Sequence, residues 1–144
     1  MKAQEFLKQL RHDEIVAAIR QAEKQTSGEI RVFISRQTVK DPVATAQGHF
    51  VEMGMDKTRE RNGVLIFVAP RACKFAVIGD AGVHTRCGDD FWTQLAHGMS
   101  VHFRKSEFTA GIVQAVQKAG ELLSQHFPRR SDDTNELSDE IARD

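Results

Sequence analysis

The chain lacks the residues and runs that mark several classes of protein. It has two cysteines among 144 residues, Cys73 and Cys87, and no Cys-x-x-Cys spacing, so the sequence indicates neither a zinc framework nor a disulfide scaffold. No apolar run approaches the ~20 residues that a membrane span requires. Residues 1–11 are charged and amphipathic, which is not typical of a signal peptide. These absences predict a cytoplasmic protein without a transmembrane segment, at most peripheral to a membrane.

An excess of charge of either sign is absent as well. The sequence has 20 Lys and Arg residues against 20 Asp and Glu residues, and its formal net charge is zero. A nucleic-acid binder needs a basic face to displace counterions, so we expect no nucleic-acid partner. The sequence also has no His-Glu-x-x-His pair, no Gly-x-Ser-x-Gly elbow and no Walker-type phosphate loop. No motif therefore indicates a reaction, and we expect no organic cofactor.

Residues 61–70, Arg-Asn-Gly-Val-Leu-Ile-Phe-Val-Ala-Pro, are the stretch around which the rest of the chain is organised. Asn62 and Gly63 form a strong turn signal, and Pro70 cannot continue a strand ladder. Between them the sequence shows no polar alternation, which predicts a central strand buried on both faces. A second apolar run, residues 74–79, follows after a break of about four residues. Such a short connection returns antiparallel, so the two runs predict a hairpin.

The segments before the hairpin predict a crossover unit. Residues 29–35 alternate in the manner of a strand. Asp41 followed by Pro42 is a helix start, because aspartate caps a helix and proline fits its first position. A strand, a helix and the central strand in succession predict parallel pairing with a right-handed connection. Apolar spacing predicts four further helices, in residues 2–11, 14–24, 90–103 and 106–126.

Together these elements predict an α/β fold, a three-layer α/β/α sandwich in which a small mixed sheet is flanked by helices. We expect one domain over residues 1–128 and an acidic tail over residues 129–144, which has six acidic residues against three arginines. The composition of the tail favours a solvated and mobile segment. Strand order stays open. A glycine-bearing loop follows the hairpin, and its residues 83–88 are a candidate for a fourth strand.

Three loops are expected to meet at one edge of this sheet. The first and central strands are parallel and begin there, and the third strand is antiparallel and ends there. Residues 26–29, 61–63 and 79–82 therefore converge. Each loop has a glycine, which allows close backbone approach or positive φ, and each has a polar residue beside it. A functional site of this fold is expected at this edge.

Carboxylates gather in these loops and at the start of the helix that follows them. Asp80, Asp89, Asp90 and Glu29 are the candidate ligands of a hard cation, Ca²⁺ or Mg²⁺, with the amide oxygen of Asn62 close by. The same helix start is an alternative site for an anion. A purely structural interpretation stays open too, because an aspartate before a glycine is common in turns and an aspartate at a helix start is common as a cap.

Four other polar residues are weighed against these candidates. Arg61 and Arg86 are placed to hold a phosphate group, and His84 is the histidine that lies in the glycine-bearing loop. Asp56 is interpreted as a solvated loop charge. Trp92 has helical spacing to other apolar residues and is expected in the core.

In these loops and strands the sequence resembles the TPM domain, a family whose founding members are a thylakoid lumen protein, a photosystem II repair protein and a worm channel modulator. The motifs that carry the resemblance are Thr26-Ser27-Gly28-Glu29-Ile30, Arg61-Asn62-Gly63-Val64-Leu65-Ile66, Phe75-Ala76-Val77-Ile78-Gly79-Asp80-Ala81-Gly82-Val83-His84 and Gly88-Asp89-Asp90-Phe91-Trp92. It covers residues 6–128, and the tail is similar to that of a small soluble bacterial subgroup. The resemblance implies an α/β/α sandwich, Ca²⁺ binding in some members and an acid phosphatase activity in some plant members. For the tail it implies that Leu137 and Ile141 dock.

Three hypotheses follow from the residues and the resemblance together. The first is a non-enzymatic accessory or interaction module with a Ca²⁺-like site in the loops 26–29, 61–63 and 79–90. The second is a metal-assisted acid phosphatase that acts on phosphate monoesters, with the ion on the aspartates and the phosphate on an arginine. The third is a purely structural partner-binding domain. Its expected partner is a membrane protein or a complex of one, bound through the surface or the acidic tail.

Overall fold

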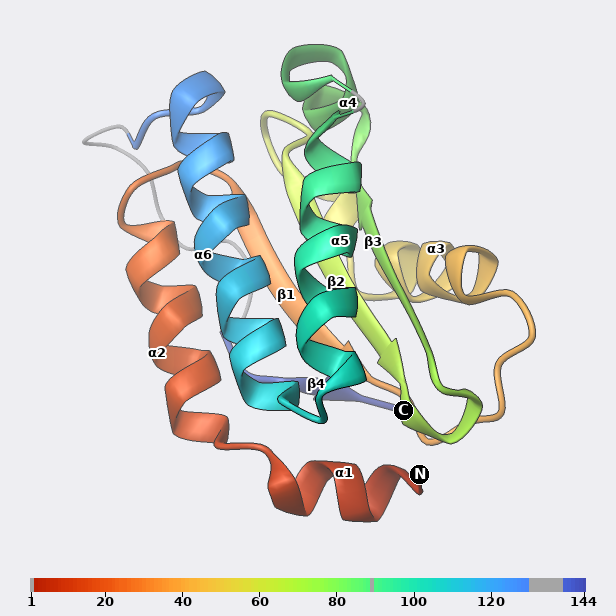
Figure 1. Cartoon of the computed structure of the whole chain (residues 1–144). Coiled ribbons are helices and arrows are strands. Elements are labelled where there is room, and N and C mark those ends of the chain that lie inside the picture. The colour runs from red at the N-terminus through yellow and green to blue at the C-terminus, as the bar shows by residue number, and fades with distance from the viewer. Residues whose placement is uncertain (1, 89, 130–138) are drawn as a thin grey trace.

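A computed structural model describes residues 2–88, 90–129 and 139–144. In this part of the chain six α-helices and four strands form one layered α/β unit (Figure 1). The helices are α1 (Ala3–Gln9), α2 (His12–Glu23), α3 (Pro42–Glu52), α4 (Ala81–Cys87), α5 (Asp90–Arg104) and α6 (Phe108–His126). The strands are β1 (Glu29–Ile34), β2 (Gly63–Ala69), β3 (Lys74–Gly79) and β4 (Ala142–Arg143), and the short 3₁₀ turns are η1 (Met55–Lys57) and η2 (Pro70–Ala72).

The sheet has the order β3-β2-β1-β4. β1 and β2 are parallel, with Glu29 opposite Gly63, and β2 and β3 are antiparallel, with Val64 opposite Gly79. Every residue of β2 is buried, as expected of a strand covered on both faces. The predicted central strand, hairpin and parallel crossover are therefore confirmed. The turn between β2 and β3 is η2, which ends at Cys73 in the left-handed region (φ 53°).

Helices cover the two faces of the sheet unequally. On one face α2, α6 and α5 lie side by side, and they bury a core that includes Ile30, Ile66 and Val116 (Figure 1). The other face is covered by α3 and η1, whose Phe50 and Met55 pack against Phe67. Two cores on opposite faces of one sheet confirm the predicted three-layer sandwich. No helix in the described ranges is long and apolar enough to cross a membrane.

The start of α3 follows from its sequence. The side chain of Asp41 accepts hydrogen bonds from the backbone N–H groups of Val43 and Ala44, both at 3.1 Å, and Pro42 occupies the first helical turn. These contacts satisfy N–H groups that have no partner within the helix. The cap and the proline fix where the crossover connection turns back toward β2.

The candidate for a fourth strand is wrong. Residues 83–88 do not form a strand, because most of them belong to α4, which Asp80 begins as its cap. The fourth strand comes from the tail: β4 pairs in parallel with β1 at Phe33 and Ile34. Asp144 anchors it, since its carboxylate accepts hydrogen bonds from the Ser35 hydroxyl and from the Arg36 backbone N–H, the latter at 2.7 Å.

Described residues 139–144 are therefore held against the domain rather than solvated. Ile141 packs on the larger core, as the family resemblance implies. Leu137, the other expected docking residue, lies outside the described residues. Residues 139–144 are held by the edge of β1 and by charge pairs, neither of which the composition of the tail reveals.

Candidate functional site

The three loops predicted to converge do meet, and backbone hydrogen bonds join them. The Asp80 N–H donates to the Gly63 carbonyl at 3.0 Å, and the Glu29 N–H donates to the Asn62 carbonyl at 3.4 Å. The Gly82 N–H donates to the Arg61 carbonyl at 2.9 Å. Strand direction alone placed these loops together, so the prediction of a shared edge is confirmed.

Asn62 is the side chain that links the first two loops. It is only 1% exposed, and its Nδ2 donates to the Ser27 hydroxyl at 3.1 Å. The Ser27 hydroxyl in turn donates to the carboxylate of Glu60. Asn62 thus has a positioning role in the loop junction, with its amide enclosed by protein.

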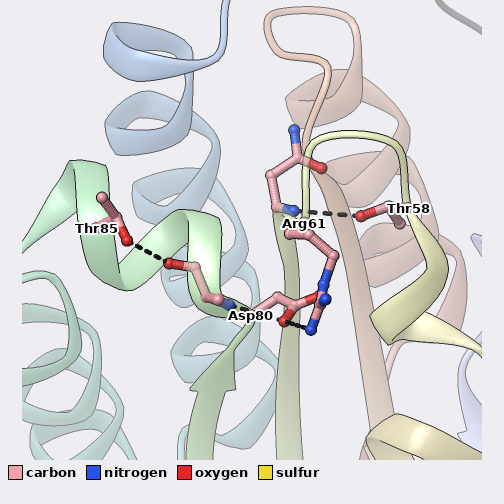
Figure 2. A network of polar contacts seen from close by, with 6 residues as sticks. Thr58, Arg61, Asp80 and Thr85 are labelled. Atoms are coloured by element: carbon pink, nitrogen blue, oxygen red, sulfur yellow. Dashed lines mark hydrogen bonds and ion pairs between the residues drawn. The ribbon is translucent and has the colours of Figure 1, made fainter.

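Asp80 lies at the centre of this edge and is paired with Arg61 (Figure 2). The Nε and Nη2 atoms of Arg61 donate to the two carboxylate oxygens at 2.6 and 2.7 Å. The backbone N–H of Ala81 also donates to Asp80, at 2.7 Å, because Asp80 caps α4. Burial acts to raise the pKa of Asp80, but the hydrogen bonds and charge of Arg61 outweigh it and hold this pKa below its ordinary value.

The guanidinium of Arg61 is reached from solvent while its partner is not. The Arg61 side chain is 53% exposed and that of Asp80 is 6% exposed. The backbone of Arg61 is in the left-handed region, with a φ of 53°. Its backbone N–H donates to the Thr58 carbonyl at 3.2 Å, which closes the turn before β2 (Figure 2). The turn therefore presents the guanidinium over the end of β3.

Glu29 points into a different environment from that of Asp80. It is 2% exposed and lies against Glu23 of α2, which also interacts with Asp139 of the tail. Burial, followed by the contacts with Asp139 and Glu29, raises the pKa of Glu23 to about 10, so Glu23 keeps its proton at neutral pH. The Ile30 N–H donates to this carboxyl group at 3.0 Å. Glu23 is a buried acid that the sequence analysis missed, because helical periodicity gives no sign of which polar residue faces a strand end.

The remaining candidates are dispersed. Arg86 is turned toward the end of α6, where it donates to the His126 carbonyl at 3.2 Å and lies 5.0 Å over the ring of Phe127. Asp90 is exposed at the start of α5. Asp89 lies outside the described residues.

His84 and Trp92 form a pair beside the Arg61–Asp80 pair. The Trp92 Nε1–H donates to His84 Nδ1 at 3.2 Å, and the two ring centroids are 4.8 Å apart. Trp92 packs on the core with part of its surface, as predicted, and its ring also lies against Gly79 at the end of β3. A methyl group on Gly79 would come within 2.2 Å of that ring, so glycine is required for this contact.

These side chains stand at one end of a hollow that we call the edge groove, of about 400 Å³. Its walls are α3 on one side and the His84–Trp92 pair on the other, and residues 77–79 of β3 lie between them. From α3 it receives Val43, Gln47 and Val51, four residues apart, which places them in one row along the helix. Val43 and Val51 are 48% and 59% exposed, and no other large apolar side chain in the described residues is as exposed as these two.

Asp56 also lines the edge groove, which corrects its interpretation as a solvated loop charge. The residue is half-buried, and its Oδ1 is enclosed without a hydrogen-bond partner in the described residues. Its charge acts on Arg61 as that of Asp80 does. The end of the groove thus has two carboxylates and one guanidinium.

The residues at this edge do not fit a Ca²⁺ or Mg²⁺ cage as they lie. Ca²⁺ takes about six to eight oxygen ligands, and Mg²⁺ requires near-octahedral geometry. Both oxygens of Asp80 are bonded to Arg61, and Glu29 lies instead with Glu23. Among the described residues no group of three or more His, Cys, Asp or Glu side chains is placed to hold a metal ion. The cation site, with Asp89 among its ligands, stays a prediction.

Comparison with known proteins agrees with this arrangement of elements. A family model described as the TPM domain matches residues 1–122. The chain is similar to the BA42 protein of the psychrophilic bacterium Bizionia argentinensis, solved by NMR, with 38% sequence identity and a TM-score of 0.86. That match covers 94% of this chain and 96% of BA42. The comparison with curated proteins finds no match.

Two more distant solved structures share the fold. One is the N-terminal domain of a protein from P. gingivalis, with 16% identity, a TM-score of 0.64 and coverage of 79% of this chain and 75% of that one. The other is the N-terminal domain of the cg2496 protein from Corynebacterium glutamicum, with 16% identity, a TM-score of 0.60 and coverage of 76% and 68%. At this level of identity the likeness concerns the fold alone.

Proposed function

The chain belongs to the TPM domain family, and we propose that it acts as a non-enzymatic interaction module that binds an extended segment of a partner protein in the edge groove. The observation that carries this proposal is the row of exposed apolar side chains, Val43 and Val51, beside an edge strand. Exposed apolar groups that line a hollow together are typical of binding surfaces rather than of scattered surface residues.

The edge of β3 supports an extended ligand. In the described part of the chain β3 pairs only with β2, so the backbone groups on its outer side have no strand beside them. A segment added there would form main-chain hydrogen bonds with β3 and place alternate side chains against α3. On the other side of the sheet, β4 pairs with Phe33 and Ile34 of β1 and so occupies that part of the edge.

The charges of the edge groove favour a neutral or basic segment. Asp56 and Asp80 supply two carboxylates against the single guanidinium of Arg61. His84 accepts a hydrogen bond from Trp92 through its Nδ1. A lysine or arginine of the ligand near Asp56 would improve this balance, whereas an acidic side chain would be repelled. We therefore expect a ligand with apolar residues at alternate positions and a basic residue toward the Asp56 end.

A library of random peptides displayed on phage, selected on the purified protein, tests the proposal. We expect enriched peptides with alternating apolar residues, and we expect Val51→Glu to abolish their binding because it places a charge in the apolar row. Ala44→Glu is the matched control, since Ala44 is exposed on the same helix but does not line the groove. In NMR spectra the bound peptide should shift amide signals of β3. Enrichment that Val51→Glu leaves intact, or shifts confined to other elements, would overturn the proposal.

The phosphatase hypothesis has its own test. Arg61, one of the two arginines assigned to phosphate, already bonds both oxygens of Asp80, and Arg86 is directed to α6. A phosphatase at this edge should hydrolyse a generic phosphate monoester and lose that activity in Asp80→Asn. Activity indifferent to this substitution would come from another source.

A further inference from the structure

A second hollow lies at the other end of the sheet, where β2 ends and β3 begins. It has a volume of about 360 Å³ and is bounded by α1, the end of α5, the start of α6 and the turn between β2 and β3. Figure 1 shows α1 crossing this end of the molecule, far from the loops of the edge groove. We call this hollow the phenylalanine pocket, because Phe6, Phe75, Phe103 and Phe108 form its walls.

The walls of the phenylalanine pocket hold one another in place. Phe6 and Phe108 have ring centroids 4.8 Å apart, and Phe103 lies edge-on to Phe75 at 5.5 Å and to Phe108 at 5.4 Å. Phe6 is buried at 2% exposure, whereas the other three rings are only partly buried. Rings that pack at these distances and angles are in favourable arrangements, so the pocket is preformed. Its volume is at the small end of the range for ligand pockets, about 300 to 1,000 Å³.

Positive charge stands at the entrance to this apolar pocket. Arg104 lines the pocket and is exposed, and no acidic residue in the described part of the chain lines it. The Arg104 guanidinium forms no hydrogen bond or ion pair with a described residue, so it is available to a ligand. Lys74 also lines the pocket, but its ammonium is held at 2.7 Å by the Lys40 carbonyl in the loop before α3, toward the other face of the sheet. An apolar interior with a cationic entrance is complementary to a molecule with an apolar body and an anionic head.

We propose that the phenylalanine pocket binds a small amphipathic anion, a medium-chain aliphatic carboxylate. The chain of such a molecule packs among the four rings, and its carboxylate meets Arg104 at the surface. The hydroxyl of Ser100, which lines the same pocket, is an additional donor near the head group. The site is independent of the edge groove, so either can be tested without the other.

Decanoate is the probe, and calorimetric titration below its micelle threshold is the first measurement. We expect saturable binding of one equivalent of decanoate and no binding of decyltrimethylammonium, which has the same chain and the opposite charge. The exposed thiol of Cys73 lines the pocket and reports the location. Bound decanoate should slow its alkylation by a maleimide and leave the rate at Cys87 unchanged. Binding of both detergents with equal affinity, or no protection of Cys73, would overturn the proposal.

Two variants separate the roles of charge and shape. Arg104→Glu should raise the Kd for decanoate by about tenfold, because the cation at the entrance is replaced by an anion. Ser100→Trp fills the pocket and should abolish binding. Lys57→Glu, an exposed charge reversal in η1, is the matched control and should bind as the wild type does. Melting curves confirm that each variant is folded. Wild-type affinity in the folded charge-reversed and pocket-filling variants would overturn the proposal.

Discussion

Arg61 and Asp80, 19 residues apart in the chain, form a two-fold hydrogen-bonded ion pair that ties the turn before β2 to the cap of α4. The pair joins two of the three loops at the edge and sets the charge of the edge groove. It also occupies the carboxylate that the cation hypothesis requires. Several properties of the protein follow from this one contact.

We expect Asp80→Asn to lower the melting temperature by a few degrees at neutral pH, because it removes the charge of the pair and weakens the cap. The pKa of Asp80 is held below its ordinary value by Arg61 and the Ala81 N–H, against the opposing effect of burial. A lowered pKa stabilises the folded state above the pKa of the unfolded state, and this stabilisation is lost as pH falls through the folded pKa. The free energy of unfolding of wild type should therefore fall more steeply below about pH 4 than that of Asp80→Asn. Parallel curves would contradict this role of the pair.

The cation hypothesis predicts that a divalent cation stabilises the protein, whereas the Arg61–Asp80 pair leaves no free carboxylate oxygen on Asp80 for such an ion. Thermal melting with EDTA, Ca²⁺, Mg²⁺ and Mn²⁺ should leave the wild type unmoved, because Arg61 holds both oxygens of Asp80. An ion at ~100 times its dissociation constant would add about 2.7 kcal/mol, which is a shift of several degrees for a domain of this size. A shift of that size in wild type, absent in Asp80→Asn, would establish the cation site instead.

Glu23 should make the protein less stable as pH rises. Its pKa is raised to about 10, first by burial and then by Asp139 and Glu29. A raised folded pKa gives stability that is fully present below the unfolded pKa and is lost as pH rises through the folded value. Glu23→Gln keeps the hydrogen bond from the Ile30 N–H without the charge. We expect it to be more stable than wild type by on the order of 2 kcal/mol at pH 8 and equal to it near pH 4.

Urea unfolding across this pH range measures the effect. Glu52→Gln, a change at an exposed carboxylate of α3, is the control and should follow the wild-type curve. If Glu23→Gln were less stable than wild type at pH 8, Glu23 would be ionised in the folded protein and the assignment of its proton would be wrong.

Removal of residues 139–144 should destabilise the domain and expose β1. The deletion removes β4, the packing of Ile141 and the contacts of Asp144 with Ser35 and Arg36. We expect a loss of about 2 kcal/mol in the free energy of unfolding. Hydrogen exchange at the Arg36 amide should become faster, and the open edge should promote self-association. Arg143→Ala, at an exposed side chain of β4, should change little, and an unchanged Arg36 exchange rate after the deletion would contradict the docking of the tail.

Two glycine substitutions should have opposite effects. A methyl group on Gly82 would lie 2.5 Å from the Glu60 carbonyl oxygen and 2.6 Å from that of Arg61, both backbone atoms that cannot move aside. Gly82→Ala should therefore cost on the order of 2 kcal/mol and disturb the loop junction. Gly48 lies within α3 with open space around it, so Gly48→Ala should stabilise the protein by about 0.5–1 kcal/mol. Denaturant titration of both variants tests the pair, and equal effects would contradict the close approach at Gly82.

Much of the fold was predictable because its signals are local. The apolar run ended by Pro70 predicts β2, and Asp41 with Pro42 predicts the start of α3. Chain direction then requires the loops at Glu29, Gly63 and Gly79 to share an edge, which the register confirms. Glu29, Arg61, Asn62 and Asp80 lie in the loops at that edge, but the contacts that each of them forms could not be predicted.

The sequence by itself determined the central strands, every described helix except α4, and the edge at which their loops meet, since periodicity, caps and turn residues act over a few neighbouring positions. Tertiary structure alone decided that Asp80 pairs with Arg61, that Glu23 is buried with Glu29, and that the tail completes the sheet through Asp144. The last contact joins residues 109 positions apart. Such contacts depend on which groups desolvation and packing bring together in space, and no local pattern in the chain encodes that choice.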